Sequence, residues 1–178
     1  MRVGDITSAA PADLGTPLQA KVYEILDALA IPFERVDTEA VVTMDDCQSV
    51  NAKLHVRMVK TLFLCNAQKT TFYLFVTRGD KPFRSKEFSK SVGSSRVSFA
   101  PADLMESMLG VTVGAATVFA KLMDRQNAVQ VVLDADVLAE EWYGCSDGTT
   151  TSYLKLRTHQ IIDAFLPHVG HRPMIVNA

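Results

Sequence analysis

The chain has 178 residues, of which 48% are hydrophobic and 21% are charged, and its formal net charge is -2. These values are typical of one globular domain with a buried core, and the mildly acidic balance argues against binding along a DNA duplex. No apolar run is long enough to span a membrane, and the three widely spaced cysteines fit reduced thiols in a cytoplasmic protein better than disulfides or a zinc site.

The first residues differ in character from the rest of the chain. Residues 1–16 lack the basic-then-apolar layout of a secretion signal, and we interpret them as an N-terminal leader. Residues 17–178 contain neither internal repeats nor a long linker. We therefore expect one domain over 17–178.

Helices are predicted where apolar residues recur at helical spacing behind a capping signal. Thr16 followed by Pro17 is a favourable helix start, and Thr43 with Asp46 three residues later resembles a capping box. The predicted helices cover residues 16–29, 44–50, 85–92, 101–109 and 158–166.

Strands are predicted from short apolar, β-branched and aromatic runs. Two of them are separated by a short polar stretch at 66–70, which is typical of an antiparallel hairpin. The predicted strands cover residues 58–65, 71–77, 96–99, 129–133 and 149–156, with shorter extended pieces at 33–36 and 174–176. Because strands and helices are interspersed without strict alternation, we expect an α+β fold with a mixed, mostly antiparallel sheet and surrounding helices.

Lys60 is unusual because it lies in the otherwise apolar run 59–65. A long cation at the start of a buried strand either extends back to solvent or faces a pocket that requires a fixed positive donor. Both interpretations remain open from the strand alone.

Two loops have the composition of a ligand pocket. Small side chains at Gly114, Ala115 and Ala116 would let backbone N–H groups approach a ligand, although the loop taken alone favours a tight connection after a helix. Asp147 and Gly148 form a turn before a hydroxyl-rich strand, which is either a pocket wall or an exposed sheet face.

A local excess of basic residues covers 69–96, including Lys81, Arg84 and Lys86. It is either a solvated surface or a short contact with the end of a nucleic acid. The four histidines are not spaced as metal ligands, and Cys145 has no evident histidine partner for nucleophilic catalysis.

Several segments, in this order and spacing, resemble the YbaK/ProX family, the free-standing relatives of the editing domain inserted in bacterial prolyl-tRNA synthetases. The chain is most similar to the branch that edits alanine on prolyl-tRNA. The matching segments lie at 59–64, 96–100, 109–114, 131–134 and 170–176.

The resemblance implies a deacylase that hydrolyses mischarged tRNA(Pro), most plausibly Ala-tRNA(Pro), without a metal or cofactor. The lysine at the position of Lys60 would be the principal functional side chain, and the substrate's own ribose hydroxyl would help to activate water. The implied partners are the acceptor end of tRNA(Pro) and prolyl-tRNA synthetase, with no DNA and no membrane. Lys81, Arg84 and Lys86 are the predicted RNA contacts.

The chain also departs from the family pattern. Thr43 and Gly114 are kept, but Val118 replaces a proline, Gly144 and Cys145 replace a His-Pro pair, Gly148 replaces an asparagine, and Asp37 replaces a histidine. The predicted substrate-binding residues are Thr43, Ser98, Gly114, Ala115, Ala116, Thr117, Val118, Gly144, Gly148 and Thr149.

Two hypotheses from different classes follow. The first is the deacylase, with Lys60 central and the loop at Gly114 shaping the pocket. The second is a non-catalytic relative that binds an amino acid, an aminoacyl-tRNA or a protein as a sensor. The loss of the family's histidine, asparagine and loop proline favours this second hypothesis.

Overall fold

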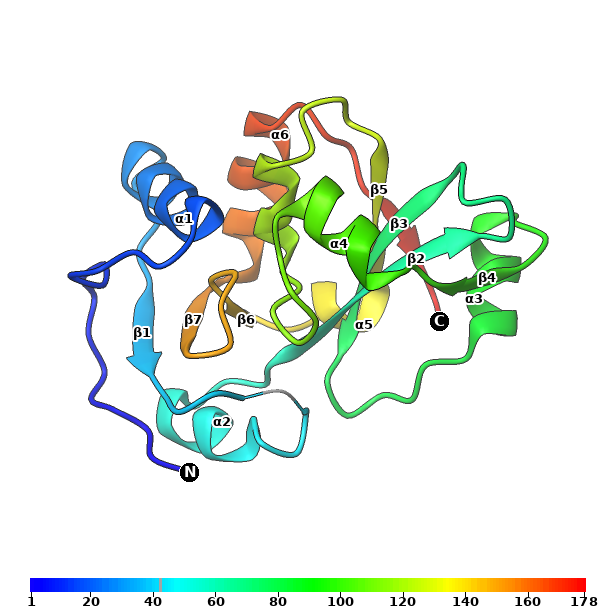
Figure 1. Ribbon diagram of the computed structural model, residues 1–178. Helices are drawn as coiled ribbons and strands as arrows, with labels where there is room; N and C mark the ends of the chain where they lie inside the picture. Colours follow the sequence, from blue (N-terminus) through cyan, green and yellow to red (C-terminus); the bar gives the residue numbers. More distant parts are fainter. Residues whose placement is uncertain (42) are drawn as a thin grey trace.

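The computed structural model describes residues 1–41 and 43–178 and contains two β-sheets with helices around them (Figure 1). The larger sheet has the strand order β4-β2-β3-β5-β8. β2 is antiparallel to both β3 and β4, whereas β3–β5 and β5–β8 are parallel pairs. The bounds of these strands are Val59–Asn66 for β2, Phe72–Arg78 for β3, Val97–Phe99 for β4, Val129–Asp134 for β5 and Met174–Val176 for β8.

The smaller sheet is antiparallel throughout and has the order β1-β7-β6. A single bridge between Met58 and Gly144 joins it to the start of β2. The fold is therefore the predicted α+β domain with mostly antiparallel pairing. The bounds are Glu34–Asp37 for β1, Trp142–Ser146 for β6 and Ser152–Arg157 for β7.

Helices cover both faces of the larger sheet. Figure 1 shows α1, α4 and α6 toward one side and α3 at the far end beside β4. The α-helices are α1 Pro17–Ala28, α2 Gln48–Leu54, α3 Ser85–Val92, α4 Ala102–Leu109, α5 Ala135–Leu138 and α6 Leu166–His168, with a 3-10 helix η1 Val118–Leu122 and a π-helix η2 Gln160–Phe165. Within the described residues, no helix combines the length and apolar character needed to cross a membrane.

Alternation along β2 explains the two cores on either face of the sheet. Phe63 and Cys65 point into the core formed with α1, α4, η1 and η2, whereas Leu64 points into the core formed with Phe88 of α3. Side chains alternate between faces along a strand, so neighbouring residues of one buried strand contribute to different cores. A third cluster, around Leu54 and Tyr153, packs α2 against the smaller sheet.

Most predicted elements are confirmed within a residue or two. The Thr16 hydroxyl caps α1 by accepting from the Gln19 amide at 3.0 Å. The β2–β3 hairpin forms as expected, with the Asn66 side-chain oxygen accepting from the backbone amides of Thr70 and Thr71 across the turn.

Three predicted elements are wrong in detail. The helix expected over 44–50 begins at Gln48, because the residues before it form a turn. The strand expected from Thr149 begins at Ser152, because Asp147 accepts from the Thr149 amide and closes a turn there. The last helical stretch continues one residue past Pro167, to His168, and its central part, Gln160–Phe165, is the π-helix η2.

The segment before α1 lies along β1. Val3 and Thr7 form bridges to Thr38 and Arg35, and the Gly4 amide donates to the Asp37 carbonyl at 2.8 Å. The expected division into a leader and a domain at residue 16 stays a prediction.

Candidate functional site

A cavity of about 290 Å³ lies beside the first half of β2. β4 pairs with β2 from Leu64 onward, and the Ala100 amide donates to the Phe63 carbonyl at 2.9 Å. Among the described residues, no strand of the larger sheet pairs with Val59–Leu62 on that side. Residues of the Gly114 loop, α4, β6, β7 and the turn before α2 complete the wall. The lining residues are Val41, Thr43, Met44, Cys47, Met58, Val59, Lys60, Thr61, Leu62, Phe63, Phe99, Met105, Val113, Gly114, Ala116, Ser146 and Tyr153.

Lys60 is half-buried at this cavity, and its ammonium donates to the Lys81 carbonyl. Burial lowers its pKa, and the charge of Asp80 acts in the opposite direction. Among the described residues, no carboxylate lies within ion-pair distance of this ammonium. Lys60 therefore lines the cavity, while its ammonium is bonded to a backbone carbonyl of a residue outside the lining set, and the pocket interpretation of Lys60 stays a prediction.

The Gly114 loop contributes only part of its predicted set. Gly114 adopts a positive φ of 90° and lines the cavity together with Ala116. Ala115, Thr117 and Val118 are buried and do not line the cavity. The Ala115 amide donates to the Thr112 carbonyl at 3.1 Å, so this N–H group already has a partner in the loop itself.

Thr43 lines the cavity from the opposite wall, at the turn that precedes α2. Its hydroxyl accepts from the Asp46 amide at 3.3 Å, and its own backbone amide donates to the Asp46 carboxylate at 3.1 Å. The reciprocal bonds confirm the predicted capping box, although it stabilises a turn and not the first turn of α2.

The remaining predicted substrate residues lie outside the cavity wall. Ser98, Gly144, Gly148 and Thr149 are not among its lining residues. A Cβ atom at Gly144 would lie 3.0 Å from the Met58 Cε atom, so Met58 occupies the space beside β6 where a larger residue would project. Met58 itself lines the cavity, which gives a physical reason for the small residue at Gly144.

Gly148 has a different constraint. Its φ is +96°, and a Cβ there would lie 2.8 Å from a methyl carbon of Leu18. The position therefore requires glycine for packing and for backbone conformation.

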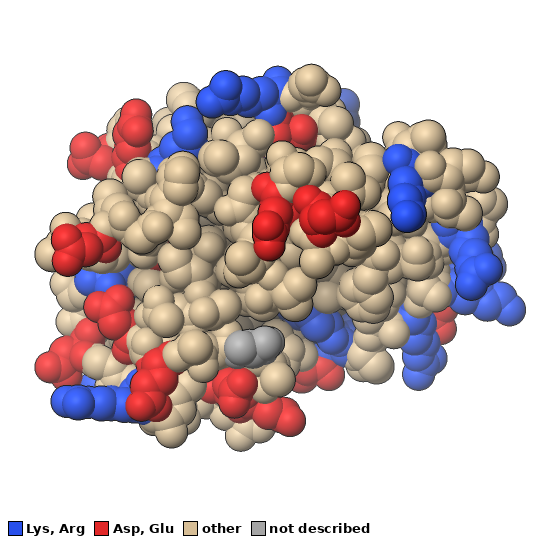
Figure 2. All heavy atoms as spheres, in the orientation of Figure 1, with Lys and Arg blue, Asp and Glu red and all other residues tan. Residues whose placement is uncertain are grey.

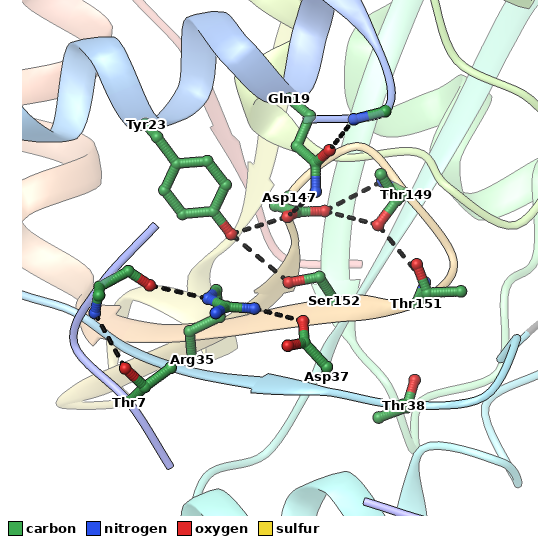
Figure 3. Close-up of polar contacts among 12 residues, drawn as sticks. Thr7, Gln19, Tyr23, Arg35, Asp37, Thr38, Asp147, Thr149, Thr151 and Ser152 are labelled. Atoms are coloured by element: carbon green, nitrogen blue, oxygen red, sulfur yellow. Dashed lines mark hydrogen bonds and ion pairs between the residues drawn. The ribbon is translucent and has the colours of Figure 1, made fainter. Parts of the chain in front are cut away.

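A buried carboxylate, Asp147, connects α1 to the turn between β6 and β7 (Figure 3). The residue before it, Ser146, lines the cavity. Tyr23 and Gln19 of α1 donate to one of its oxygens at 2.7 and 2.9 Å. The hydroxyl of Thr149 donates to the other oxygen at 2.7 Å. Burial and then the Asp147 charge raise the pKa of Tyr23. Helix α1 and the β6–β7 turn are thus tied together directly behind the site.

The cysteine thiols near the site are poor nucleophiles. Cys47 lines the cavity, and burial, with a smaller effect of Asp46, raises its pKa to about 11. Cys145 is fully buried, and burial raises its pKa as well. Both thiols are protonated near neutral pH, whereas nucleophilic attack requires the thiolate. Across residues 1–41 and 43–178, no cluster of His, Cys, Asp and Glu could hold a metal ion.

The basic residues predicted to contact RNA have different surroundings. The Lys81 ammonium donates to Asp134 at 2.8 Å and to Asp136 at 3.0 Å, so its charge is largely neutralised within the protein. Arg84 pairs with Glu87 at 3.3 Å on the surface. In Figure 2, Lys and Arg side chains gather over the end of the molecule formed by α3 and β4, while Asp and Glu gather over α4 and around α2. Lys86 lies on α3.

The sequence model of the aminoacyl-tRNA editing domain family matches residues 38–164. This chain belongs to that family. The prolyl-tRNA editing protein ProX of Acetoanaerobium sticklandii is 30% identical over 113 residues, which cover 64% of this chain and 69% of the relative. The prolyl-tRNA synthetase associated domain-containing protein 1 of Bos taurus is 29% identical over 167 residues, which cover 92% of this chain and 96% of the relative.

A solved structure supports the same fold. The crystal structure of a "putative trans-editing enzyme for prolyl tRNA synthetase" has a TM-score of 0.68 and 16% identity. The alignment covers 93% of this chain and 99% of that one. The family prediction and the α+β fold class are therefore both confirmed.

Several residues that line the cavity were not among the predicted site residues. Ser146, Met58 and Tyr153 approach the site only through pairing of the two sheets, and Met44, Met105 and Phe99 come from three separate segments. None of these residues carries a local pattern that separates it from an ordinary core residue, because each belongs to an apolar run or to a turn.

Proposed function

We propose that this protein is a trans-acting aminoacyl-tRNA deacylase that hydrolyses mischarged tRNA(Pro), with Ala-tRNA(Pro) as its preferred substrate. The observation that carries the proposal is the presence of Lys60 in the wall of a small, mostly apolar cavity beside the first half of β2. Membership of the editing-domain family supports it independently. The acceptor end of tRNA(Pro) would be the substrate, prolyl-tRNA synthetase a partner, and the cytoplasm the place of action.

Hydrolysis needs a water molecule to attack the ester carbonyl carbon while the bond to the ribose oxygen breaks and that oxygen takes a proton. Because the thiols are protonated, we assign the attack to water and not to Cys47 or Cys145. Lys60 would hold the ribose or phosphate of the terminal adenosine, or the aminoacyl group, so that the ester is oriented for attack. The neighbouring ribose hydroxyl would assist, as the family resemblance implies.

The size of the cavity supports a small acyl group. Ligand pockets typically occupy about 300–1,000 Å³, so this cavity is at the small end of the range. A synthetase pocket built for proline excludes alanine weakly, since each missing methylene is worth only about 1–3 kcal/mol. A second, smaller pocket with Gly114 and Ala116 in its wall would admit alanine and exclude proline.

A non-catalytic sensor is the second candidate, and one observation favours it. Among the described lining residues there is no carboxylate or imidazole that could act as a general base. Such a protein would bind aminoacyl-tRNA or an amino acid in the same cavity without turnover.

Deacylation assays with tRNA(Pro) charged with alanine, cysteine, serine or proline separate the two candidates. The deacylase predicts fastest release of alanine and loss of that activity in Lys60→Ala, with Lys21→Ala on α1 as a matched control outside the cavity. Saturable binding of Ala-tRNA(Pro) with no release above the uncatalysed rate would support the sensor and overturn the deacylase.

A further inference from the structure

Phe99, the last residue of β4, exposes 62% of its surface at the rim of the cavity. Single exposed apolar residues are normal, but this ring is also held in a defined position. Phe83 packs against it with ring centroids 5.5 Å apart in an edge-to-face arrangement, and Phe83 in turn rests on the buried Phe88. One aromatic surface is therefore supported from below and open to solvent above.

The sheet register places this ring on the same face as Lys60. Phe99 pairs with Leu64 of β2, and residues paired directly across antiparallel strands share a face. Lys60 lies four positions before Leu64, so alternation brings its side chain to that face too, about 13 Å along the strand. Phe99 and Lys60 thus line one cavity from two positions along β2.

A basic groove of about 420 Å³ begins at the other end of β4. A hydrogen bond connects β4 to α3 at this end: the Val97 amide donates to the Ser89 hydroxyl at 3.0 Å. Lys86 and Lys90 are one helical turn apart on α3, and no carboxylate is among the described residues that line the groove. Figure 2 shows Lys and Arg side chains gathered over this end of the molecule. The lining residues are Ser85, Lys86, Ser89, Lys90, Ser94, Ser95, Arg96 and Val97.

An aromatic platform next to a hydroxyl-rich cationic groove is the arrangement that binds single-stranded nucleic acid, with bases stacked on rings and phosphates in the groove. We infer that β4 and α3 form a binding track for the single-stranded 3′ end of an RNA. Phe99 stacks on the terminal base, and Lys86, Lys90 and Arg96 bind the phosphates that precede it. This inference rests on the proposed function, because it places the ester of that terminal nucleotide at Lys60.

Lys81 and Arg84, two of the originally predicted RNA contacts, are not part of this track, because their charges are paired with acidic side chains. Lys86 is retained, and Lys90 and Arg96 are added.

The test is the binding of a fluorescein-labelled RNA hairpin that carries no amino acid and ends in single-stranded CCA, measured by fluorescence anisotropy. Stacking on one base contributes enough that Phe99→Ala and Phe99→Leu should each weaken binding by about 5-fold or more, whereas Phe99→Trp should retain it. The same hairpin with an abasic terminal nucleotide should bind weakly to the wild type and be insensitive to Phe99→Ala. Ile175→Ala, an exposed apolar residue on β8, is the matched control.

The salt dependence of RNA binding tests the phosphate contacts in the groove. Combining Lys86→Ala with Lys90→Ala should reduce the slope of log affinity against log salt by about 0.7 for each phosphate contact removed. Equal affinity of wild type and Phe99→Ala, or equal affinity for the abasic and adenine-ended hairpins, would overturn the stacking assignment. An unchanged salt slope would overturn the phosphate assignment.

These results are independent of ester hydrolysis, because the RNA carries no aminoacyl ester. If Lys60-dependent deacylation is found while Phe99→Ala binds normally, the track is wrong and the deacylase stands. If Phe99-dependent binding is found without deacylation, the track stands and the proposed activity is wrong.

Discussion

Asp147 is completely buried and accepts from Tyr23, from Gln19 and twice from Thr149, so its removal should be severe. In Asp147→Ala these donors lose their acceptor, and each unsatisfied buried polar group costs about 1–3 kcal/mol. Allowing for some relaxation of the turn, we expect a loss of about 4 kcal/mol in the free energy of unfolding. Tyr23→Phe removes the bond to Asp147 at 2.7 Å and the longer contact with the Ser152 hydroxyl at 3.4 Å, and it should cost about 1.5–3 kcal/mol.

Urea unfolding followed by circular dichroism at pH 7 measures both effects, with the m-value showing whether the compactness of the two states is unchanged. Asp13→Ala, an exposed acidic residue before α1, is the matched control and should differ little from wild type. In an Asp147→Asn background, Tyr23→Phe should cost less than in the wild type, because the two side chains contact each other. A loss below about 1 kcal/mol for Asp147→Ala, or strict additivity of the pair, would refute the reasoning.

Two further predictions concern stability. Neutral His171 accepts from the Val131 amide at 2.9 Å, and burial lowers its pKa from 6.5 to about 4. As the pH falls, the unfolded chain takes up the His171 proton at a higher pH than the folded protein does. The stability that neutral His171 contributes is therefore complete above pH 6.5 and is lost as the pH falls toward 4. His171→Gln should flatten that part of a stability–pH curve from urea titrations; an unchanged curve would contradict the assignment. Gly148→Ala combines a positive φ with a clash against Leu18 and should cost about 1–3 kcal/mol in the same assay, whereas a neutral effect would show that the turn rearranges freely.

Local chemistry explains which parts of this fold could be predicted from the sequence. The Thr16 cap, the polar turn at Asn66 and the apolar runs on either side of it are short-range signals, and the structure confirms each of them. Lys60 was conspicuous for the same reason, as a charge in an apolar strand. Gly114 and Thr43 were recognised through the family resemblance, and both line the cavity.

The parts that could not be predicted depend on contacts between distant segments. β6 contains Gly144, a poor strand former, and is held in place by pairing with β7 and by the bridge to Met58. Ser146, a cavity residue, precedes Asp147, which is bonded to side chains of α1 more than 120 positions away in sequence. Loop residues such as Ala115 carry no periodic pattern that would show which of them face the pocket.

The central claim is that the Lys60 ammonium orients an aminoacyl ester in the cavity beside β2. Single-turnover deacylation of Ala-tRNA(Pro), with the protein in excess, tests it most directly by comparing wild type with Lys60→Ala, with folding checked by circular dichroism. A fixed charge of this kind is worth about 100-fold or more in rate, so the variant should be slower by at least that factor. A folded Lys60→Ala protein that deacylates at the wild-type rate would contradict the account.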